Sequence, residues 1–195
     1  MAKGKFIVFE GPDGSGQTTQ AEVLRRYFQE KNIPVILTKE PTKETEAGRK
    51  LSDVLNHRIE ATPNEIQELF NEDRKYHIET LILPSLNEGR IVISDRYFFS
   101  SIAYGPEDYD HESVYENFPL PDLTFILEIS PEESIQRILK RGKPVQLYET
   151  KEKLSKVMVN YRNLASKFPN VHILDGERPA EVISQEIIEL VSKIL

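Results

Sequence analysis

The feature that most constrains the fold is a short apolar run that ends at a glycine-rich loop. Lys5–Glu10 reads KFIVFE, which is typical of a strand buried inside a parallel sheet. The next eight residues, Gly11–Thr18, read GPDGSGQT. From Thr18 to Lys31 the apolar residues recur at helical spacing. A strand, a loop and a helix in this order begin a β-α-β unit, which requires a parallel sheet covered by helices.

The rest of the chain repeats this alternation of strand and helix. Four further apolar runs predict strands at Ile33–Thr38, Arg90–Asp95, Leu123–Ile129 and Val171–Asp175. Helical patterns cover Thr45–His57, Thr62–Gly89, Pro131–Arg141, Lys151–Phe168 and Pro179–Ile194. We therefore predict an α/β fold of three layers, in which helices flank a five-stranded parallel sheet. Ligands of such sheets bind at the carboxyl ends of the strands.

The longest helical pattern has a defined start. Thr62 is the predicted N-cap, Pro63 suits the first helical position, and Glu65 completes a capping box. Pro84 predicts a kink near the far end, and Gly89 closes the helix.

Length and composition predict one domain that covers residues 1–195. The net charge of −7 argues against general binding to nucleic acid or a membrane surface, which favours a basic excess. The chain has no cysteine, and hence neither disulfides nor thiolate chemistry. Because no signal peptide and no long apolar run appear, we expect a cytoplasmic protein.

The loop Gly11–Thr18 matches seven of the eight positions of the phosphate-loop pattern G-x-x-x-x-G-K-[ST], counting its four free positions. Its glycines allow backbone N–H groups to turn towards an anion, and the following helix adds its positive end. The hydroxyl of Thr18 is placed to bind Mg²⁺. Gln17 departs from the pattern, because it stands where lysine is required. A glycine-rich turn without a ligand is the alternative, and three glycines before a Thr-Thr helix start argue against it.

Further segments extend this pattern along the chain. In order, they are FEGPDGSGQTTQ, TKEPT, LFNEDR, SDRYFFSSIAY and PDLTFILEISPEESIQRILKRG. Together they resemble the thymidylate kinases, which are P-loop nucleoside-monophosphate kinases. The resemblance covers nearly the full length. It implies a P-loop kinase fold with a short lid at about residues 142–150, ATP as phosphate donor, dTMP as acceptor, Mg²⁺ as cofactor and a homodimer.

The resemblance also assigns residues on the donor side. Those expected to bind ATP are Glu10, Gly11, Pro12, Asp13, Gly14, Ser15, Gly16, Gln17, Thr18, Thr19, Arg137 and Arg141. Arg141 is expected to stack on adenine, and Gly142 to act as a hinge or helix stop. Thr18 and Asp95 are expected to hold Mg²⁺, with Asp95 acting through water. Arg96 is expected to bridge the phosphates of donor and acceptor, although a DR pair at a strand end is often only a surface ion pair.

On the acceptor side, Phe70 and Arg74 lie four residues apart and share a helix face. The resemblance implies that Phe70 stacks on thymine and that Arg74 hydrogen-bonds an exocyclic oxygen, whereas periodicity alone favours core packing for Phe70. Ser101 is also expected to bind the acceptor. Tyr104 matches the residue that crowds the sugar 2′ position, but Gly105 stands where the family usually has glutamine.

Two further side chains are assigned to the acceptor. Asp13 matches the family carboxylate near the sugar hydroxyl. Lys39 stands where many members have arginine, and we expect it at the acceptor phosphate, with Lys43 and Arg49 as competitors. The residues expected to carry the transfer itself are Gln17, Lys39, Asp95 and Arg96.

Gln17 leaves one positive charge unaccounted for. Losing a charge-assisted contact in a dry site can reduce the rate by about 10²–10³. The arginines that replace it in some relatives would fall at Gly14, Ser15 or Leu147, and none of these is basic. Three interpretations remain: a working kinase with charge from Lys143, Arg137, Arg141 or Arg96, an engineered Lys→Gln change, or a weakly active or inactive nucleotide-binding relative. A kinase for another nucleoside monophosphate is a further alternative.

Overall fold

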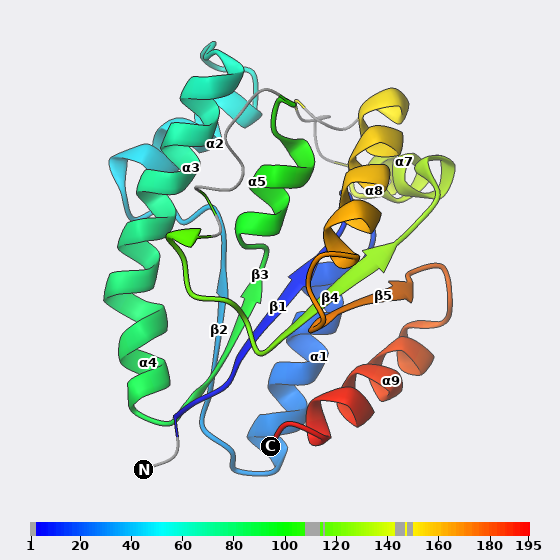
Figure 1. The fold of residues 1–195 in the computed structure, drawn as a ribbon. Coiled ribbons are helices and arrows are strands. Elements are labelled where there is room, and N and C mark those ends of the chain that lie inside the picture. Colours follow the sequence, from blue (N-terminus) through cyan, green and yellow to red (C-terminus); the bar gives the residue numbers. More distant parts are fainter. Residues whose placement is uncertain (1–2, 108–113, 115, 143–146, 148–149) are drawn as a thin grey trace.

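In the computed structural model, residues 3–107, 114, 116–142, 147 and 150–195 are described. Five parallel strands form one sheet in the order β2-β3-β1-β4-β5, and helices cover both of its faces (Figure 1). The strands are β1 Phe6–Glu10, β2 Val35–Lys39, β3 Ile91–Asp95, β4 Leu123–Glu128 and β5 Val171–Asp175. The predicted three-layer α/β fold is thus confirmed.

The helices follow the predicted ranges closely, and they keep the labels of Figure 1. They are α1 Gln17–Glu30, α2 Glu46–Leu55, α3 Pro63–His77, α4 Leu83–Asn87, α5 Phe98–Tyr104, α7 Pro131–Lys140, α8 Lys151–Ala165 and α9 Ala180–Ser192. The short helix α5 was not predicted. Among the described residues, no helix is long and apolar enough to span a membrane.

The long helical pattern is not one regular α-helix as predicted. Its capping box is confirmed, because Thr62 accepts from the backbone of Glu65 while the Glu65 side chain accepts from the backbone of Thr62. After α3, however, the hydrogen bonds change to a π-helical pattern over η1 (Ile78–Ile82), and α4 follows. Pro84 lies directly after this stretch and has no N–H to continue an α-helical ladder. The irregularity expected at the proline therefore begins before it.

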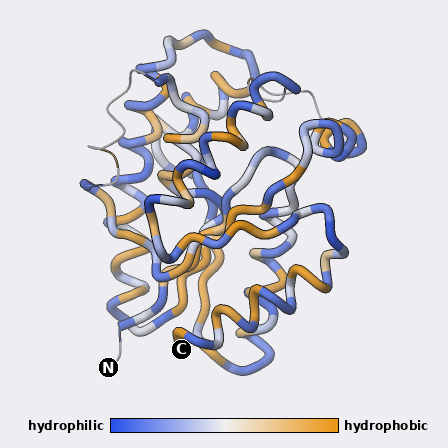
Figure 2. Tube along the Cα trace, turned by 45° about the vertical axis from the view of Figure 1, so that its right-hand side comes forward, coloured by the Kyte–Doolittle hydropathy of each residue, from blue (hydrophilic) through white to orange (hydrophobic). Residues whose placement is uncertain are grey.

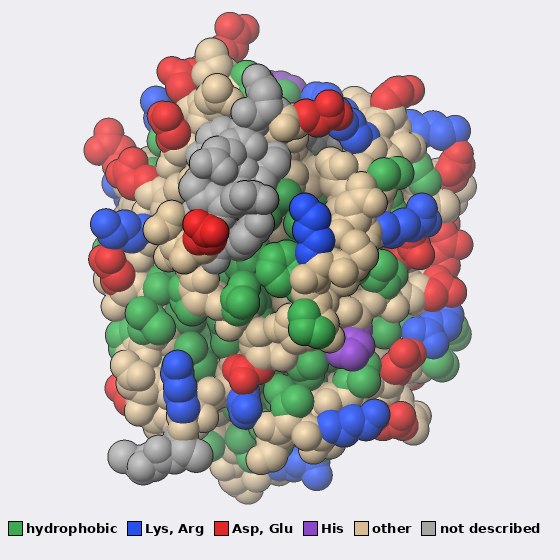
Figure 3. Space-filling model, in the orientation of Figure 1, with side chains coloured by type: hydrophobic (Ala, Val, Ile, Leu, Met, Phe, Trp, Pro, Cys, Tyr) green, Lys and Arg blue, Asp and Glu red, His purple; other side chains and the backbone are tan. Residues whose placement is uncertain are grey.

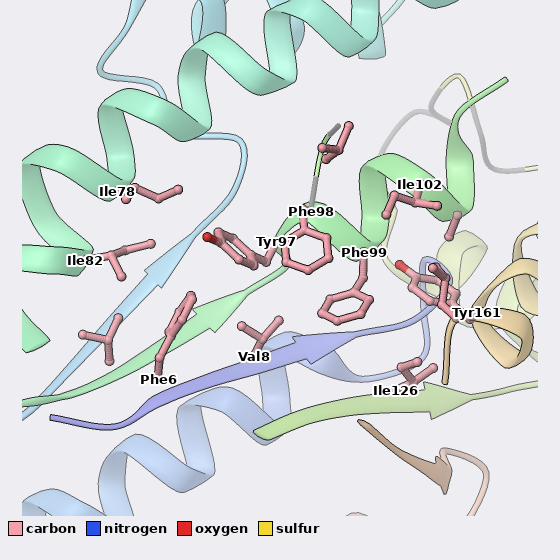
Figure 4. Packing of buried hydrophobic residues seen from close by; sticks show 14 of the residues in the cluster. Phe6, Val8, Ile78, Ile82, Tyr97, Phe98, Phe99, Ile102, Ile126 and Tyr161 are labelled. Atoms are coloured by element: carbon pink, nitrogen blue, oxygen red, sulfur yellow. The ribbon is translucent and has the colours of Figure 1, made fainter. Parts of the chain in front are cut away.

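The central strand β1 divides the core into two layers. Its alternate residues Phe6 and Val8 face a cluster formed with η1, α4, α5 and α8, which contains Tyr97 and Phe99 (Figure 4). Ile7 and Phe9 face the opposite cluster, built with α1 and α9. Figure 2 shows the consequence, a sheet that is mostly hydrophobic between helices of mixed hydropathy. All five β1 side chains are inaccessible to solvent or nearly so, so the loop after β1 starts from a rigid strand.

The register of the sheet brings three loops to one edge. Phe9 pairs with Asp95, and Lys39 also pairs with Asp95. The backbone N–H of Arg96 donates to Phe9 O at 2.9 Å, and that of Glu40 donates to Asp95 O at 3.1 Å. The segments after β1, β2 and β3 therefore leave the sheet side by side, as the strand pattern predicts.

Candidate active site

The glycine loop has the backbone that a phosphate cradle needs. Gly11, Gly14 and Gly16 have φ angles of 142°, 84° and 103°, which L side chains rarely adopt. A β-carbon at Gly11 would also lie 2.6 Å from Leu127 O of β4. Helix α1 begins directly after Gly16, and no side chain caps its N-terminus. Its first N–H groups are therefore oriented towards the loop and can bind an anion.

Two oxygens at the loop are buried without a hydrogen-bond partner among the described residues. They are Ser15 Oγ and Asp95 Oδ1. The other oxygen of Asp95 accepts from Thr18 Oγ1 at 2.5 Å, so these two residues, from α1 and the end of β3, lie together as predicted. A hydroxyl and one carboxylate, with the remaining positions left to phosphate and water, are ligands that suit Mg²⁺. The residues present therefore fit an ATP–Mg²⁺ complex.

Arg96 lies against the glycine loop rather than on the open surface. Its Nη2 donates to Asp13 Oδ1 at 2.8 Å, while Nη1 donates to Gly11 O at 3.1 Å and to Ser100 Oγ at 2.9 Å. Burial works against the charge of the guanidinium, but nearby Asp13 raises the pKa of Arg96 well above its usual range. Arg96 is therefore a fixed positive charge, and its ion pair is not a solvated surface one.

Gln17 folds back onto the same loop. Its Nε2 donates to Gly11 O at 2.6 Å, and its Oε1 accepts from Arg96 Nη2 at 3.4 Å. The side chain is buried with the first turn of α1. The position that the pattern reserves for lysine is therefore uncharged, and the cation next to it is the Arg96 guanidinium.

A cavity of about 460 Å³ opens beside the loop. It is lined by Asp13, Lys39, Glu40, Pro41, Thr42, Lys43, Gly48, Ser52, Leu55, Asn56, Phe70, Arg74, Arg96, Tyr97, Ser100, Tyr104 and Arg141. Seven of these were predicted to bind nucleotide. Its lining combines apolar and aromatic side chains with seven charged ones, which suits a small ligand that carries both a ring and a charge. Phe70 also packs against the Leu51 cluster, so the core-packing alternative describes part of its surroundings.

Arg74 is the most enclosed charge of the cavity wall, with 1% of its surface exposed. Its Nε donates to Glu40 Oε2 at 2.8 Å, and its Nη2 donates to Ser101 Oγ at 2.8 Å. The guanidinium carbon lies 5.6 Å from the ring centre of Tyr97. Ser101 is thus placed behind Arg74 and does not line the cavity. The structure brings the predicted pair of Phe70 and Arg74 to the same wall.

Tyr104 and Asp13 meet at the boundary between cavity and loop. The Tyr104 hydroxyl donates to Asp13 Oδ2 at 3.1 Å. Burial, and then the Asp13 carboxylate, raise the pKa of Tyr104, which keeps the phenol protonated as a donor. Asp13 is therefore neutralised by Arg96 on one oxygen and hydrogen-bonded by Tyr104 on the other. Because its charge is already paired, this carboxylate can lie beside phosphate groups without strong repulsion.

Glu10 is placed away from the cavity. Its side chain is fully buried and accepts from the backbone N–H groups of Tyr97 and Ser100 and from the hydroxyl of Tyr161. Burial raises the pKa of the Glu10 carboxyl to about 7, against the lowering effect of Arg96 and of these hydrogen bonds. The carboxylate thus holds the start of α5 in place.

The predicted cations occupy different surroundings. Lys39 is largely exposed and its Nζ lies 2.5 Å from Asp95 Oδ2. Arg137 pairs with Glu133, and its Nη1 donates to Gly176 O at 3.1 Å beside the loop. Arg141 lines the cavity and ends α7. Gly142 follows with a φ of 67°, as expected of a helix stop.

Part of the expected lid lies outside the described residues. This includes Lys143, which was one candidate for the missing charge. Thr19 is exposed on the first turn of α1. Pro12 accepts the backbone bond of Ser15 and so closes the loop.

Several residues of the site were not assigned from sequence. Asp73 accepts from Thr42 N, Thr42 Oγ1 and Thr45 Oγ1 and so fixes the segment after β2. Glu40 and His77 pair behind Arg74. The sequence did carry a signal for Asp73 and His77, because both recur with Arg74 at helical spacing in the predicted helix Thr62–Gly89. Ser134, which donates to Asp13 O from α7, had no recognisable signal.

The comparisons with known proteins agree with this geometry. The family model described as thymidylate kinase matches residues 9–187. The chain belongs to the thymidylate kinase family. A relative named "Probable thymidylate kinase" from Pyrococcus horikoshii is 38% identical over 97% of this chain and 96% of its own. The thymidylate kinase of Desulfotalea psychrophila is 35% identical over 98% and 96%.

A solved structure supports the family fold. The thymidylate kinase of Candida albicans superposes with a TM-score of 0.84, at 24% identity, over 99% of this chain and 93% of its own. At that identity the likeness concerns the fold. Members of the family are nucleoside-monophosphate kinases, so the chain is a phosphotransferase.

Proposed function

We propose that this chain transfers the terminal phosphoryl group of ATP to dTMP, giving ADP and dTDP on the route to dTTP. Family membership supports the reaction class. The observation that carries the proposal is the place of Arg96, which contacts the glycine loop through Gly11 O and lines the adjacent cavity. One rigid cation is thus shared between a donor site and an acceptor site, as in-line transfer between two phosphates requires.

The donor phosphates would lie on the backbone N–H groups of the loop and of the first turn of α1, with Ser15 Oγ as an additional donor. Thr18 Oγ1 and Asp95 would hold Mg²⁺, which supplies charge neutralisation on the phosphate oxygens when bound. Arg137 borders the loop from α7 and Arg141 lines the cavity, so both can contact the donor nucleotide.

The acceptor would lie in the cavity with its base between Phe70 and Arg74. Of the five N–H groups of Arg74, the described residues occupy three, through Glu40, Ser101 and Asn71. One N–H on Nη1 and one on Nη2 are left for an acceptor such as a pyrimidine carbonyl oxygen. Tyr104 and Asp13 would border the sugar, and Lys39 would reach the phosphate. No protein base is required, because the attacking group is already a phosphate oxygen.

The charge absent at Gln17 would come from Arg96, whose guanidinium is the described cation in contact with that side chain. This favours the working-kinase interpretation. An inactive relative would not need the cavity, the neutralised Asp13 and the paired Thr18 and Asp95 to be kept together.

The test is ADP release with ATP–Mg²⁺ against a panel of nucleoside monophosphates. We expect dTMP to give the highest kcat/KM, with dUMP next and purine monophosphates last. Absence of turnover with every acceptor would overturn the proposal, and a preference for another monophosphate would reassign the acceptor.

The family resemblance also supports a homodimer. Tyr76 is 41% exposed on α3, and Leu81 and Leu83 are only partly buried on η1 and α4. Figure 3 shows hydrophobic side chains gathered on the side of the molecule where these helices run in Figure 1. Light scattering coupled to gel filtration tests this, with a mass of twice 22.5 kDa expected.

A further inference from the structure

A chain of buried polar groups leads to the base-facing wall of the cavity, which Glu40 and Arg74 help to line. It runs from Thr38 at the end of β2, through His77 and Glu40, to Arg74 on α3. Glu40, His77 and Arg74 are each no more than 3% exposed. A buried arginine keeps one orientation only when fixed acceptors occupy part of its N–H fork. The source of that fixation determines what Arg74 can present to a ligand.

Glu40 divides its two oxygens between neighbouring turns of α3. Oε2 accepts from Arg74 Nε at 2.8 Å, and Oε1 lies 3.0 Å from His77 Nδ1. Because a carboxylate only accepts hydrogen bonds at neutral pH, Nδ1 carries the proton of this contact. The imidazole therefore clamps the rotation of the carboxylate, and the carboxylate in turn orients Arg74.

The far nitrogen of the ring is also held. His77 Nε2 lies 2.7 Å from Thr38 Oγ1, so the ring is bound at both nitrogens. The backbone N–H of Glu40 donates to Asp95 O, which anchors the main chain of Glu40 to β3, the strand that carries the phosphate-side residues. Arg74 is thus positioned relative to the sheet and not only relative to its own helix.

From this geometry we infer that His77 and Glu40 form a positioning pair that holds Arg74 for the acceptor base. Neither side chain needs to touch the substrate. The inference rests on the proposed function, since it names the device by which that function selects a base carrying carbonyl oxygens. Its expected signature is a change in dTMP binding without a matching change in ATP binding or in the transfer step.

The test compares two substitutions at one position. His77→Leu removes the hydrogen-bond donor to Glu40. His77→Asn keeps a donor there, because its Nδ2 group occupies the place of the histidine Nδ1. We expect His77→Leu to raise the KM for dTMP about 10-fold, with kcat and the KM for ATP within about 3-fold of the wild type. We expect His77→Asn to stay within about 3-fold on all three parameters. Thr80→Val, on the exposed face of η1, is the matched control and should match the wild type.

A second variant covers the case in which His77→Leu does not fold. Thr38→Val removes only the outer hydrogen bond and keeps the shape of the side chain, and it should raise the KM for dTMP by about 3-fold over that of the control Thr80→Val. A KM for dTMP equal to that of Thr80→Val would overturn the inference. Equal KM values for His77→Leu and His77→Asn, or a parallel rise in the KM for ATP, would overturn the inference. Calorimetric binding of dTMP separates this outcome from failure of the proposed function, in which the wild type itself would neither bind nor phosphorylate dTMP.

Discussion

The two halves of the site are built in different ways. The donor half is one continuous segment, Gly11–Thr18, whose glycine φ angles and helix start present backbone N–H groups. The acceptor half is assembled from α3, α5 and the segment after β2, and the buried charges of α3 are held by partners from the other two. Phosphate recognition here is a property of local backbone shape, whereas base recognition is a property of tertiary ion pairs.

Arg96 belongs to both halves, and its removal should have the largest effect. Arg96→Ala deletes the cation beside the loop, and we expect kcat to fall by about 10²–10³ while the KM for dTMP changes only a few-fold. Arg96→Lys should recover part of the rate, because it restores the charge without the fork. Steady-state kinetics of the two variants measure kcat and the KM for dTMP.

Arg90→Ala is the matched control for these variants, because Arg90 precedes the other end of β3 and is 45% exposed in a surface pair with Glu88. A loss of similar size in that variant would show that general disturbance of the strand, and not the charge at the loop, explains the result.

The acceptor half should depend on its tertiary anchors for folding stability. Asp73 is 1% exposed and accepts three hydrogen bonds from Thr42 and Thr45. Asp73→Ala leaves these donors without a partner and should lower the free energy of unfolding by about 2–4 kcal/mol, measured by urea denaturation. Asp53→Ala, which breaks an exposed pair with Arg58, should cost less than about 0.5 kcal/mol. If the free energy of unfolding falls by less than about 0.5 kcal/mol in both variants, the stability of the acceptor wall does not depend on Asp73.

Glu10, buried at the end of β1, should make the folding stability depend on pH. Its pKa is about 7 in the folded protein and 4.5 as the reference value. Between these values the folded state binds more protons than the unfolded state, so the contribution of Glu10 is full below pH 4.5 and is lost as the pH rises through 7. Glu10→Gln has no carboxyl group to ionise, so it avoids this loss of folding stability at higher pH. Relative to the wild type, it should therefore gain roughly 1–3 kcal/mol of stability between pH 5 and pH 8.

Denaturation at several pH values measures this difference. A constant offset between the two proteins across that range would mean that the carboxyl of Glu10 titrates alike in the folded and unfolded states.

The smallest effect is expected where the sequence departs most from the phosphate-loop pattern. Because Arg96 already contacts Gln17, the ammonium of Gln17→Lys would add a second cation beside a guanidinium. We expect kcat to stay within about 3-fold of the wild type. A rise of about 10-fold or more, with little change in dTMP affinity, would instead identify Gln17 as the point where catalysis is limited.

Much of the fold follows from local patterns. Apolar runs placed all five strands, since a strand buried on both faces must be apolar along its whole length. The capping box at Thr62 was equally readable, because it involves residues three apart. Helix α5 could not be predicted from the sequence, because the aromatic run at Phe98–Phe99 suits a strand as well as a helix. The packing of these rings on β1 decides in favour of the helix.

The site divides in the same way. The amino-acid sequence by itself determined the phosphate loop and the family, because a glycine-rich loop between a strand and a helix is a pattern of neighbouring residues. Only the tertiary structure decided that Thr18 contacts Asp95, that Arg96 lies against Gln17, that Asp13 pairs with Arg96 and accepts from Tyr104, and that Glu40 and His77 hold Arg74. These pairs join residues about 30 to 90 positions apart, and the free energy of a buried charge depends on which partner the fold brings within hydrogen-bond distance.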